Sequence, residues 1–289
     1  MEAQTAGALA SLSDEISTTV ERVAASVVAV EGRSRIGSSG FFVRPDLILT
    51  ADHALESDEI EIVRADGKEE SVTIAGRDPS TDLALLRTAT VGTPLEFSAA
   101  VPRVGAIALA VARDDDGDVA ATMGVISAVG AAWRTWQGGE IDRFVRADLS
   151  FYPRFSGSPL LDVAGRVVGL NTGGLSRRQA VTVPAPTIQR IVETLLTRGG
   201  RIPRGYLGVA LQGVTGGAIV LGVEEKSPAD TGGVIVGDII TAMGGKPVAD
   251  ADEVHAQLGS GAVGERLRID VLRGGTPRQL EVVVGERTE

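Results

Sequence analysis

The sequence predicts an all-β domain, a barrel or a sandwich, followed by a smaller α+β domain. From residue 26 onward, short apolar runs such as Val27-Val28-Ala29-Val30 alternate with Gly, Ser, Pro and Asp at close spacing, which is typical of all-β folds. In the last 85 residues or so, strand-like runs alternate with short helical stretches. The chain has 289 residues, of which 43% are hydrophobic, so it can supply cores for two domains.

The first 198 residues hold two predicted helices around a series of strands. Leu9, Leu12, Ile16 and further apolar residues at spacings of three and four predict an amphipathic helix within residues 1–25 that packs on the first domain. A second apolar stripe predicts a helix over 186–198, which closes the domain and ends at Gly199-Gly200. Strands are expected at 27–30, 40–43, 47–50, 60–63, 72–75, 83–86, 106–111, 123–129, 144–147, 167–171 and 180–183.

The domain boundary is placed in a short stretch without periodicity. Residues 199–204 are basic and contain Gly and Pro, so we expect a linker between a domain at 26–198 and a second domain at 205–289. The second domain has predicted strands at 207–211, 218–223, 239–243, 266–272 and 279–284, and predicted helices at 229–231 and 252–258.

Composition excludes several classes of function. A formal charge of −10 without a basic patch argues against binding to nucleic acid or to an anionic membrane. The chain has no cysteine, which excludes disulfides, thiol catalysis and thiolate metal sites. Its two histidines, His53 and His255, lie far apart, so we expect no metal site and no cofactor.

Three residues form a candidate catalytic set, in the chain order His, Asp, Ser. Ser156 lies in a turn just before the apolar run Pro159-Leu160-Leu161, His53 ends the run Leu47–Asp52, and Asp82 begins the run 83–86. Hydrolysis of an amide by serine needs a base for the hydroxyl proton, a carboxylate to hold that base, and N–H groups for the oxyanion. Asp52 and Asp78 compete with Asp82, but Asp52 adjoins His53 and its side chain should diverge, whereas Asp78 precedes a proline and is typical of a turn.

The segments around these residues resemble the HtrA/Deg family of trypsin-like serine proteases. The resemblance rests on Gly37-Ser38-Ser39-Gly40-Phe41, Ile48–His53, Asp82–Leu86, Ser156–Leu160 and the strand Val167–Asn171, and it spans about residues 20 to 286. It implies two six-stranded antiparallel β-barrels, serine endopeptidase activity on unfolded or exposed polypeptides, and catalysis by His53, Asp82 and Ser156.

The second domain carries its own resemblance, to the PDZ domains of that family. Arg204-Gly205-Tyr206-Leu207-Gly208-Val209 is similar to the loop that receives a peptide's C-terminal carboxylate, and Ser227-Pro228-Ala229 with 237–240 and 245–248 continues the pattern. The resemblance implies a small α+β PDZ domain that binds peptide C-termini at Tyr206, Leu207, Gly208 and Val209.

One departure from the family pattern bears on activity. The family's nucleophile segment is usually Gly-Asn-Ser-Gly-Gly-Pro, whereas this chain has Arg154-Phe155-Ser156-Gly157-Ser158-Pro159. The resemblance implies an oxyanion hole made by the N–H groups of Arg154 and Ser156, and a non-glycine residue at the first position predicts a flipped peptide and low basal activity. The alternative is a catalytically impaired protease-like scaffold that binds peptides.

Further expectations concern partners, specificity and location. Ser150, six residues before Ser156, offers no carboxylate for Lys or Arg, and the resemblance implies cleavage after Val, Ala or Leu. The family often forms trimers through N-terminal aromatic residues, which residues 1–30 lack, so a homo-oligomer is only a possibility. No leader or membrane segment is recognisable, which predicts a soluble protein, extracytoplasmic by resemblance and cytoplasmic if the chain is complete.

Overall fold

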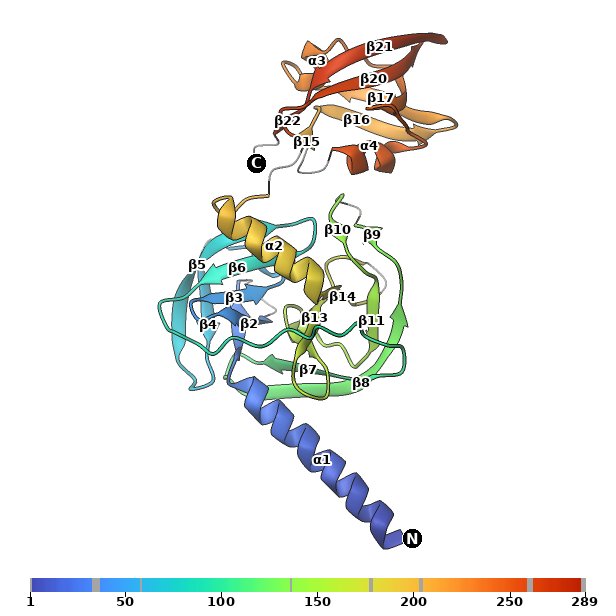
Figure 1. The fold of residues 1–289 in the computed structure, drawn as a ribbon. Coiled ribbons are helices and arrows are strands. Elements are labelled where there is room, and N and C mark those ends of the chain that lie inside the picture. Colours follow the sequence, from blue (N-terminus) through green and yellow to red (C-terminus); the bar gives the residue numbers. More distant parts are fainter. Residues whose placement is uncertain are drawn as a thin grey trace. The chain divides into compact units, whose positions relative to one another are not determined.

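The computed structural model describes residues 2–32, 37–57, 59–135, 137–176, 179–202, 205–258 and 262–286. The chain divides into two compact units, residues 1–201 and 202–289. The first unit holds two closed barrels and two longer helices, and the second holds a separate sheet with short helices (Figure 1).

The first barrel is closed by six antiparallel strands in the order β1-β2-β3-β6-β5-β4. Its core consists of buried aliphatic side chains together with Phe42. The predicted strand 72–75 is part of a longer strand, because the polar residues Glu69 to Ser71 continue the ladder with β4. The strands are β1 (Val27–Glu31), β2 (Ser38–Arg44), β3 (Leu47–Thr50), β4 (Ile60–Val63), β5 (Glu69–Asp78) and β6 (Leu83–Arg87).

The second barrel is closed in the order β11-β14-β13-β12-β7-β8. The prediction of two six-stranded antiparallel barrels is thereby confirmed. A short hairpin of β9 (Trp133–Arg134) and β10 (Glu140–Ile141) was not predicted, because two-residue strands leave no apolar run. The barrel strands are β7 (Ile107–Arg113), β8 (Val119–Val129), β11 (Val145–Asp148), β12 (Pro159–Leu161), β13 (Val167–Thr172) and β14 (Val181–Pro184).

Both predicted helices of the first unit form, but α1 (Glu2–Ala24) packs less than expected. Val23 and Ala24 are buried, and Arg22 donates a hydrogen bond to the Ala164 carbonyl at 2.7 Å. Leu9 and Leu12 are 65% and 41% exposed, so among its described side chains the helix packs on the first domain only through its C-terminal part. Helix α2 (Ala185–Thr197) does bury its apolar stripe, and the residues after it lie against β5, where the Arg77 N–H donates to the Gly200 carbonyl at 3.2 Å.

The second unit is a sheet in the order β16-β17-β18-β20-β21, with its own buried apolar core. The predicted strand 207–211 was wrong at its start, because Gly208 has a φ of 78° and interrupts it. The elements are β15 (Gly205–Tyr206), β16 (Val209–Val214), β17 (Gly217–Val223), α3 (Pro228–Thr231), β18 (Ile239–Met243), β19 (Lys246–Pro247), α4 (Ala251–Gln257), β20 (Arg266–Arg273), β21 (Thr276–Val283) and β22 (Gly285–Glu286).

Candidate active site

The three candidate catalytic residues lie at strand ends in both barrels. His53 belongs to a 3-10 turn, η1 (Asp52–Ala54), directly after β3, and Asp82 directly precedes β6, which pairs with β3. Ser156 follows a second 3-10 turn, η2 (Pro153–Phe155), and precedes β12 of the second barrel. The first barrel therefore supplies the imidazole and the carboxylate, and the second supplies the hydroxyl.

His53 and Asp82 are joined by two hydrogen bonds. The His53 Nδ1 lies 2.7 Å from Asp82 Oδ2, and the His53 backbone N–H donates to Asp82 Oδ1 at 2.8 Å. Asp82 is 3% exposed and its Oδ2 accepts hydrogen bonds, so we assign the ring proton to the facing Nδ1. This leaves Nε2 as a proton acceptor, which is the form that a general base requires.

The two competing aspartates, Asp52 and Asp78, form hydrogen bonds with residues other than His53. Asp52 is turned away from the imidazole and accepts a hydrogen bond from Arg77 Nε at 2.5 Å, and its burial raises the pKa of its carboxyl although Arg77 lowers it. Asp78 accepts from the Ser80 hydroxyl at 2.7 Å and the Thr81 hydroxyl at 2.6 Å. Both side chains therefore stabilise the segments that carry His53 and Asp82.

Ser156 is 6% exposed and is held against β2 and the end of β13. The Ser39 N–H donates to the Ser156 carbonyl at 2.9 Å, and the Gly173 N–H donates to the Ser156 hydroxyl at 3.3 Å. Gly157 has a φ of 83°, and a Cβ there would lie 2.0 Å from the Ser39 carbonyl oxygen, so the serine turn requires glycine. Within the described residues, no hydrogen bond joins the Ser156 hydroxyl to His53; such bonds are often long without substrate.

The segment after β13 contributes residues that the sequence analysis did not identify. Thr172 donates its hydroxyl proton to Asp82 Oδ2 and accepts the Gly174 N–H at 2.8 Å. A Cβ on Gly174 would lie 2.5 Å from both Asp82 Oδ2 and His53 Nδ1. The Gly-Gly pair after a predicted strand was a visible signal, but only the tertiary structure brings it to the carboxylate.

The two N–H groups expected to form an oxyanion hole belong to Arg154 and Ser156. In this structure the Ser156 N–H donates to the Pro153 carbonyl oxygen at 3.2 Å, as part of the 3-10 turn η2. The donor that would face an oxyanion is therefore already bonded to the peptide group that precedes Arg154.

The Arg154 side chain lies in a small charged cluster beside this turn. Its guanidinium donates two hydrogen bonds to the Asp115 carboxylate, and its Nη1 lies 3.6 Å from Glu31 Oε1. Burial and the neighbouring Asp115 raise the pKa of Glu31 to about 7, while Arg154 lowers it. Hydrogen bonds from Arg154 hold the pKa of Asp115 below its usual value.

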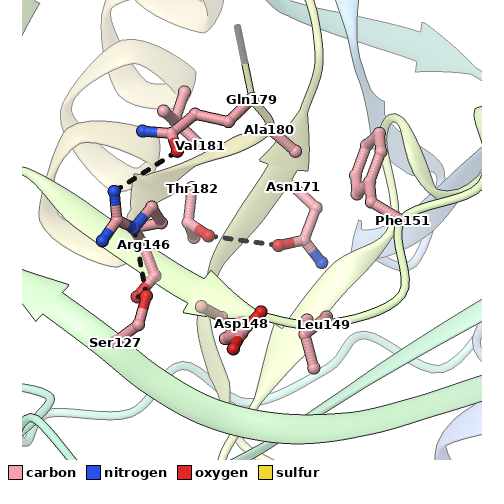
Figure 2. Close-up of a pocket in the computed structure, with 11 residues that line it drawn as sticks. Ser127, Arg146, Asp148, Leu149, Phe151, Asn171, Gln179, Ala180, Val181 and Thr182 are labelled. Atoms are coloured by element: carbon pink, nitrogen blue, oxygen red, sulfur yellow. Dashed lines mark hydrogen bonds between the residues drawn. The ribbon is translucent and has the colours of Figure 1, made fainter.

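A cavity of about 560 Å³ is lined by residues of β8, β11, β13 and β14 and of the loop after β11 (Figure 2). Arg146 and Ser127 lie at one end and Phe151 at the other (Figure 2). Phe151 Cε1 and Ser156 Oγ each lie 3.8 Å from the position of a Gly173 Cβ, which places the Phe151 wall near the hydroxyl. Asp148 also lines the cavity, whereas Ser150 is exposed and is not among the lining residues. Polar side chains such as Arg146 and Asp148 therefore line this cavity together with the apolar Leu149 and Phe151.

The predicted peptide-binding residues lie together in the second unit. Tyr206, Leu207, Gly208 and Val209 line a cavity of about 140 Å³ together with Leu211, Glu224, Val254 and Leu258. The Tyr206 hydroxyl donates to the Glu224 carboxylate. Strand β16 is at the edge of its sheet, so the edge beside this cavity is available for an added strand.

No three His, Cys, Asp or Glu side chains in the described ranges are grouped so that they could hold a metal ion. Over the same ranges, no helix has both the length and the apolar character needed to cross a membrane.

Residues 38–170 match the trypsin-like peptidase domain family, and residues 205–284 match the PDZ domain family. The chain is 32% identical over 273 residues to a probable periplasmic serine endoprotease, DegP-like, from Ectopseudomonas mendocina, covering 87% of this chain and 56% of that protein. A DegP-like protein of Chlamydia pneumoniae is 30% identical over 277 residues, covering 89% and 56%. The chain thus spans about half the length of these relatives.

Solved structures of similar length also combine these two domains. The HtrA-type protease AlgW, solved with a decapeptide, matches with a TM-score of 0.76 at 25% identity over 95% of this chain and 99% of that one. A serine endoprotease from Yersinia pestis matches with a TM-score of 0.76 at 26% identity over 94% and 98%. The fold is that of a trypsin-like peptidase domain followed by one PDZ domain. The chain belongs to the HtrA family of serine proteases.

Proposed function

We propose that this chain is a serine endopeptidase that cleaves unfolded or exposed polypeptides through His53, Asp82 and Ser156. The observation that carries the proposal is the buried Asp82 carboxylate bound to His53 Nδ1 at 2.7 Å, in a fold whose second barrel presents Ser156. An acceptor-only carboxylate on Nδ1 keeps Nε2 unprotonated, so the imidazole can accept the hydroxyl proton.

Each step of the reaction follows from these atoms. Ser156 Oγ attacks the scissile carbonyl carbon while His53 Nε2 takes the hydroxyl proton, and the carbonyl π electrons move to oxygen. The proton then passes from Nε2 to the leaving amine, which leaves an acyl group on Ser156. Water, deprotonated by the same nitrogen, then attacks the acyl carbon; the bond from that carbon to Ser156 Oγ breaks, the acyl group leaves as a carboxylic acid, and Nε2 returns its proton to Ser156 Oγ.

The resting enzyme has low activity because its oxyanion donors are not arranged for the intermediate. With the Ser156 N–H bonded to the Pro153 carbonyl, the negative oxygen would meet a carbonyl instead of donors. Loss of one oxyanion donor costs about a hundred- to a thousandfold in rate. Substrate, or a peptide bound by the second unit, would have to favour rotation of the peptide between Pro153 and Arg154.

The second unit binds peptide C-termini by adding a strand to β16. Its carboxylate loop is formed by Leu207 and Gly208, and the apolar side chains of Leu211, Val254 and Leu258 leave room for one small side chain. The relatives named as periplasmic favour an extracytoplasmic location. Cleavage after Val, Ala or Leu, and a homo-oligomeric state, stay predictions.

A peptide-binding scaffold with an impaired protease domain is the second candidate. The occupied Ser156 N–H favours it, since a turn that never rotated would leave His53, Asp82 and Ser156 almost inactive.

Proteolysis of an unfolded protein tests the proposal against this alternative. The chain should cleave casein, and Ser156→Ala should reduce the rate by several orders of magnitude with an unchanged circular dichroism spectrum. No cleavage by the unaltered chain, with or without a peptide for the second unit, would favour the scaffold. Equal cleavage by Ser156→Ala would show that the serine assignment is wrong.

A further inference from the structure

The nucleophile turn is fixed at Arg154 by contacts on both its side chain and its backbone. The guanidinium donates to both oxygens of Asp115, and the Arg154 carbonyl oxygen accepts the Ser39 hydroxyl proton at 2.9 Å. The Ser39 hydroxyl oxygen in turn accepts the Arg113 N–H at 3.1 Å. Strand β2 and the β7–β8 turn therefore hold the same residue from two directions.

The β7–β8 turn, which carries Asp115, is stabilised by hydrogen bonds within the turn. Asp114 Oδ1 accepts the N–H groups of Asp116 at 3.2 Å and Asp118 at 2.7 Å, and the Gly117 N–H donates to the Asp114 carbonyl at 3.0 Å. The buried Arg113 at the end of β7 donates from Nε to the Val27 carbonyl at 2.8 Å. Asp115 is thus presented by a turn that has hydrogen bonds of its own besides those to Arg154.

The cluster leaves little room for Arg154 to move while the ion pair persists. A Cβ on Gly37 would lie 2.6 Å from Arg154 Nη1, 2.6 Å from Glu31 Oε1 and 2.9 Å from Asp115 Oδ1, so the three side chains converge on this glycine. Rotation of the peptide before Arg154 would change the direction in which this residue leaves the turn. A side chain held by two hydrogen bonds opposes such a change.

We propose that Asp115 is a positioning residue, which through its two hydrogen bonds to Arg154 holds η2 in the conformation where the Pro153 carbonyl occupies the Ser156 N–H. The proposal rests on the proposed function and names the contact that controls its oxyanion hole. It differs from a backbone effect of a non-glycine residue at position 154, since it assigns the resting state to the Arg154 side chain and its partner.

The expected size of the effect follows from the exposure of the pair. The Arg154 and Asp115 side chains are 30% and 53% exposed, so solvent weakens their attraction. A bidentate pair of this exposure shifts a two-state equilibrium by about three- to tenfold. Complete formation of the hole by loss of this pair alone is not expected.

The test compares two substitutions in the β7–β8 turn that each remove one negative charge. Steady-state kinetics are measured for the full chain on a single peptide substrate. Asp115→Asn should raise kcat about three- to tenfold and change KM by less than about twofold, because the turn controls the oxyanion donor and not substrate binding. Asp116→Asn removes the same charge from the same turn without a contact to Arg154, and should leave kcat unchanged. Arg154→Lys, which keeps the charge but loses the fork, should behave like Asp115→Asn.

The dependence of kcat on salt concentration distinguishes an ion pair that controls the turn from a purely structural role of Asp115. Sodium chloride screens an exposed ion pair, so kcat of the unaltered chain and of Asp116→Asn should rise with salt, whereas kcat of Asp115→Asn should not. Should Asp115→Asn fail to fold, Arg154→Lys and the salt series still decide the question.

The outcomes separate this inference from the proposed function. If cleavage disappears with Ser156→Ala in every background, but Asp115→Asn equals or falls below Asp116→Asn, the inference is overturned and the proposed function stands. If cleavage survives Ser156→Ala, or no variant cleaves, both are overturned.

Discussion

Asp82 combines an unusual backbone conformation with a carboxylate that accepts three hydrogen bonds. Its φ is 57°, which non-glycine residues seldom adopt, although Asn and Asp are the commonest among them. The carboxylate accepts from the His53 backbone, the His53 ring and the Thr172 hydroxyl. Strained residues persist where their surroundings hold them, and they cluster at functional sites. Here the residue with positive φ carries the carboxylate that bonds both the ring and the backbone of His53.

Glu31 provides a residue-scale prediction about stability and pH. Its pKa rises from 4.5 to about 7 in the folded protein through burial and the nearby Asp115. The folded state therefore binds this proton more tightly than the unfolded chain, so its contribution to stability is present below about pH 4.5 and is lost as the pH rises to 7. Urea unfolding should show that Glu31→Gln gains stability relative to the unaltered chain between these pH values.

The exposed Glu15 on α1 offers the matched control for that measurement. Glu15→Gln should follow the unaltered chain at every pH, since the side chain is surrounded by solvent. A Glu31→Gln difference that stays constant from pH 4.5 to 8 would mean that Glu31 ionises as it does in the unfolded chain.

At the scale of elements, the loop between β15 and β16 is the proposed site of carboxylate binding. Gly208 has a φ of 78°, and a Cβ there would lie 2.2 Å from Ser227 Cβ. Gly208→Ala should therefore displace the loop and weaken binding of a peptide with a free C-terminus by about tenfold or more. Fluorescence anisotropy of a labelled peptide measures this directly.

Gly216 separates this effect from backbone strain alone. Its φ of 86° is similar, but a Cβ there would meet nothing within 4 Å. Gly216→Ala should bind the peptide as the unaltered chain does. Equal binding by Gly208→Ala, or equal affinity for free and amidated peptides, would argue against a carboxylate loop at Leu207 and Gly208.

At the scale of the whole molecule, the pattern of strands was predictable because short continuous apolar runs between turn residues indicate buried strands. Runs such as Leu47–Thr50 and Leu83–Arg87 are buried along most of their length and were predicted within one residue. Strand ends in solvent, such as Glu69 to Ser71 of β5, leave no apolar signal. The exposure of Leu9 and Leu12 could not be predicted either, since an amphipathic pattern does not show how far its partner surface extends.

The candidate site was predictable to a smaller extent. His53, Asp82 and Ser156 stand in segments with family-like sequences, and the fold brings the first two into contact. Thr172, Gly174 and Asp115 reach the site only through tertiary contacts, across 90 residues for the Thr172–Asp82 hydrogen bond and 39 residues for the Asp115–Arg154 pair. Residue types so common carry no individual signal, so these contacts required the tertiary structure.

Labelling of Ser156 by an active-serine phosphonate probe tests the central claim of a His53-Asp82-Ser156 catalytic site most directly. Intact-mass and peptide mass spectrometry should find one probe molecule per chain, on Ser156, because only a serine beside an unprotonated imidazole is nucleophilic enough to react. Ser156→Ala should take up no probe, and Asp82→Asn should react far more slowly. Absence of labelling in the unaltered chain with a peptide bound to the second unit, or labelling that persists in Ser156→Ala, would contradict the account.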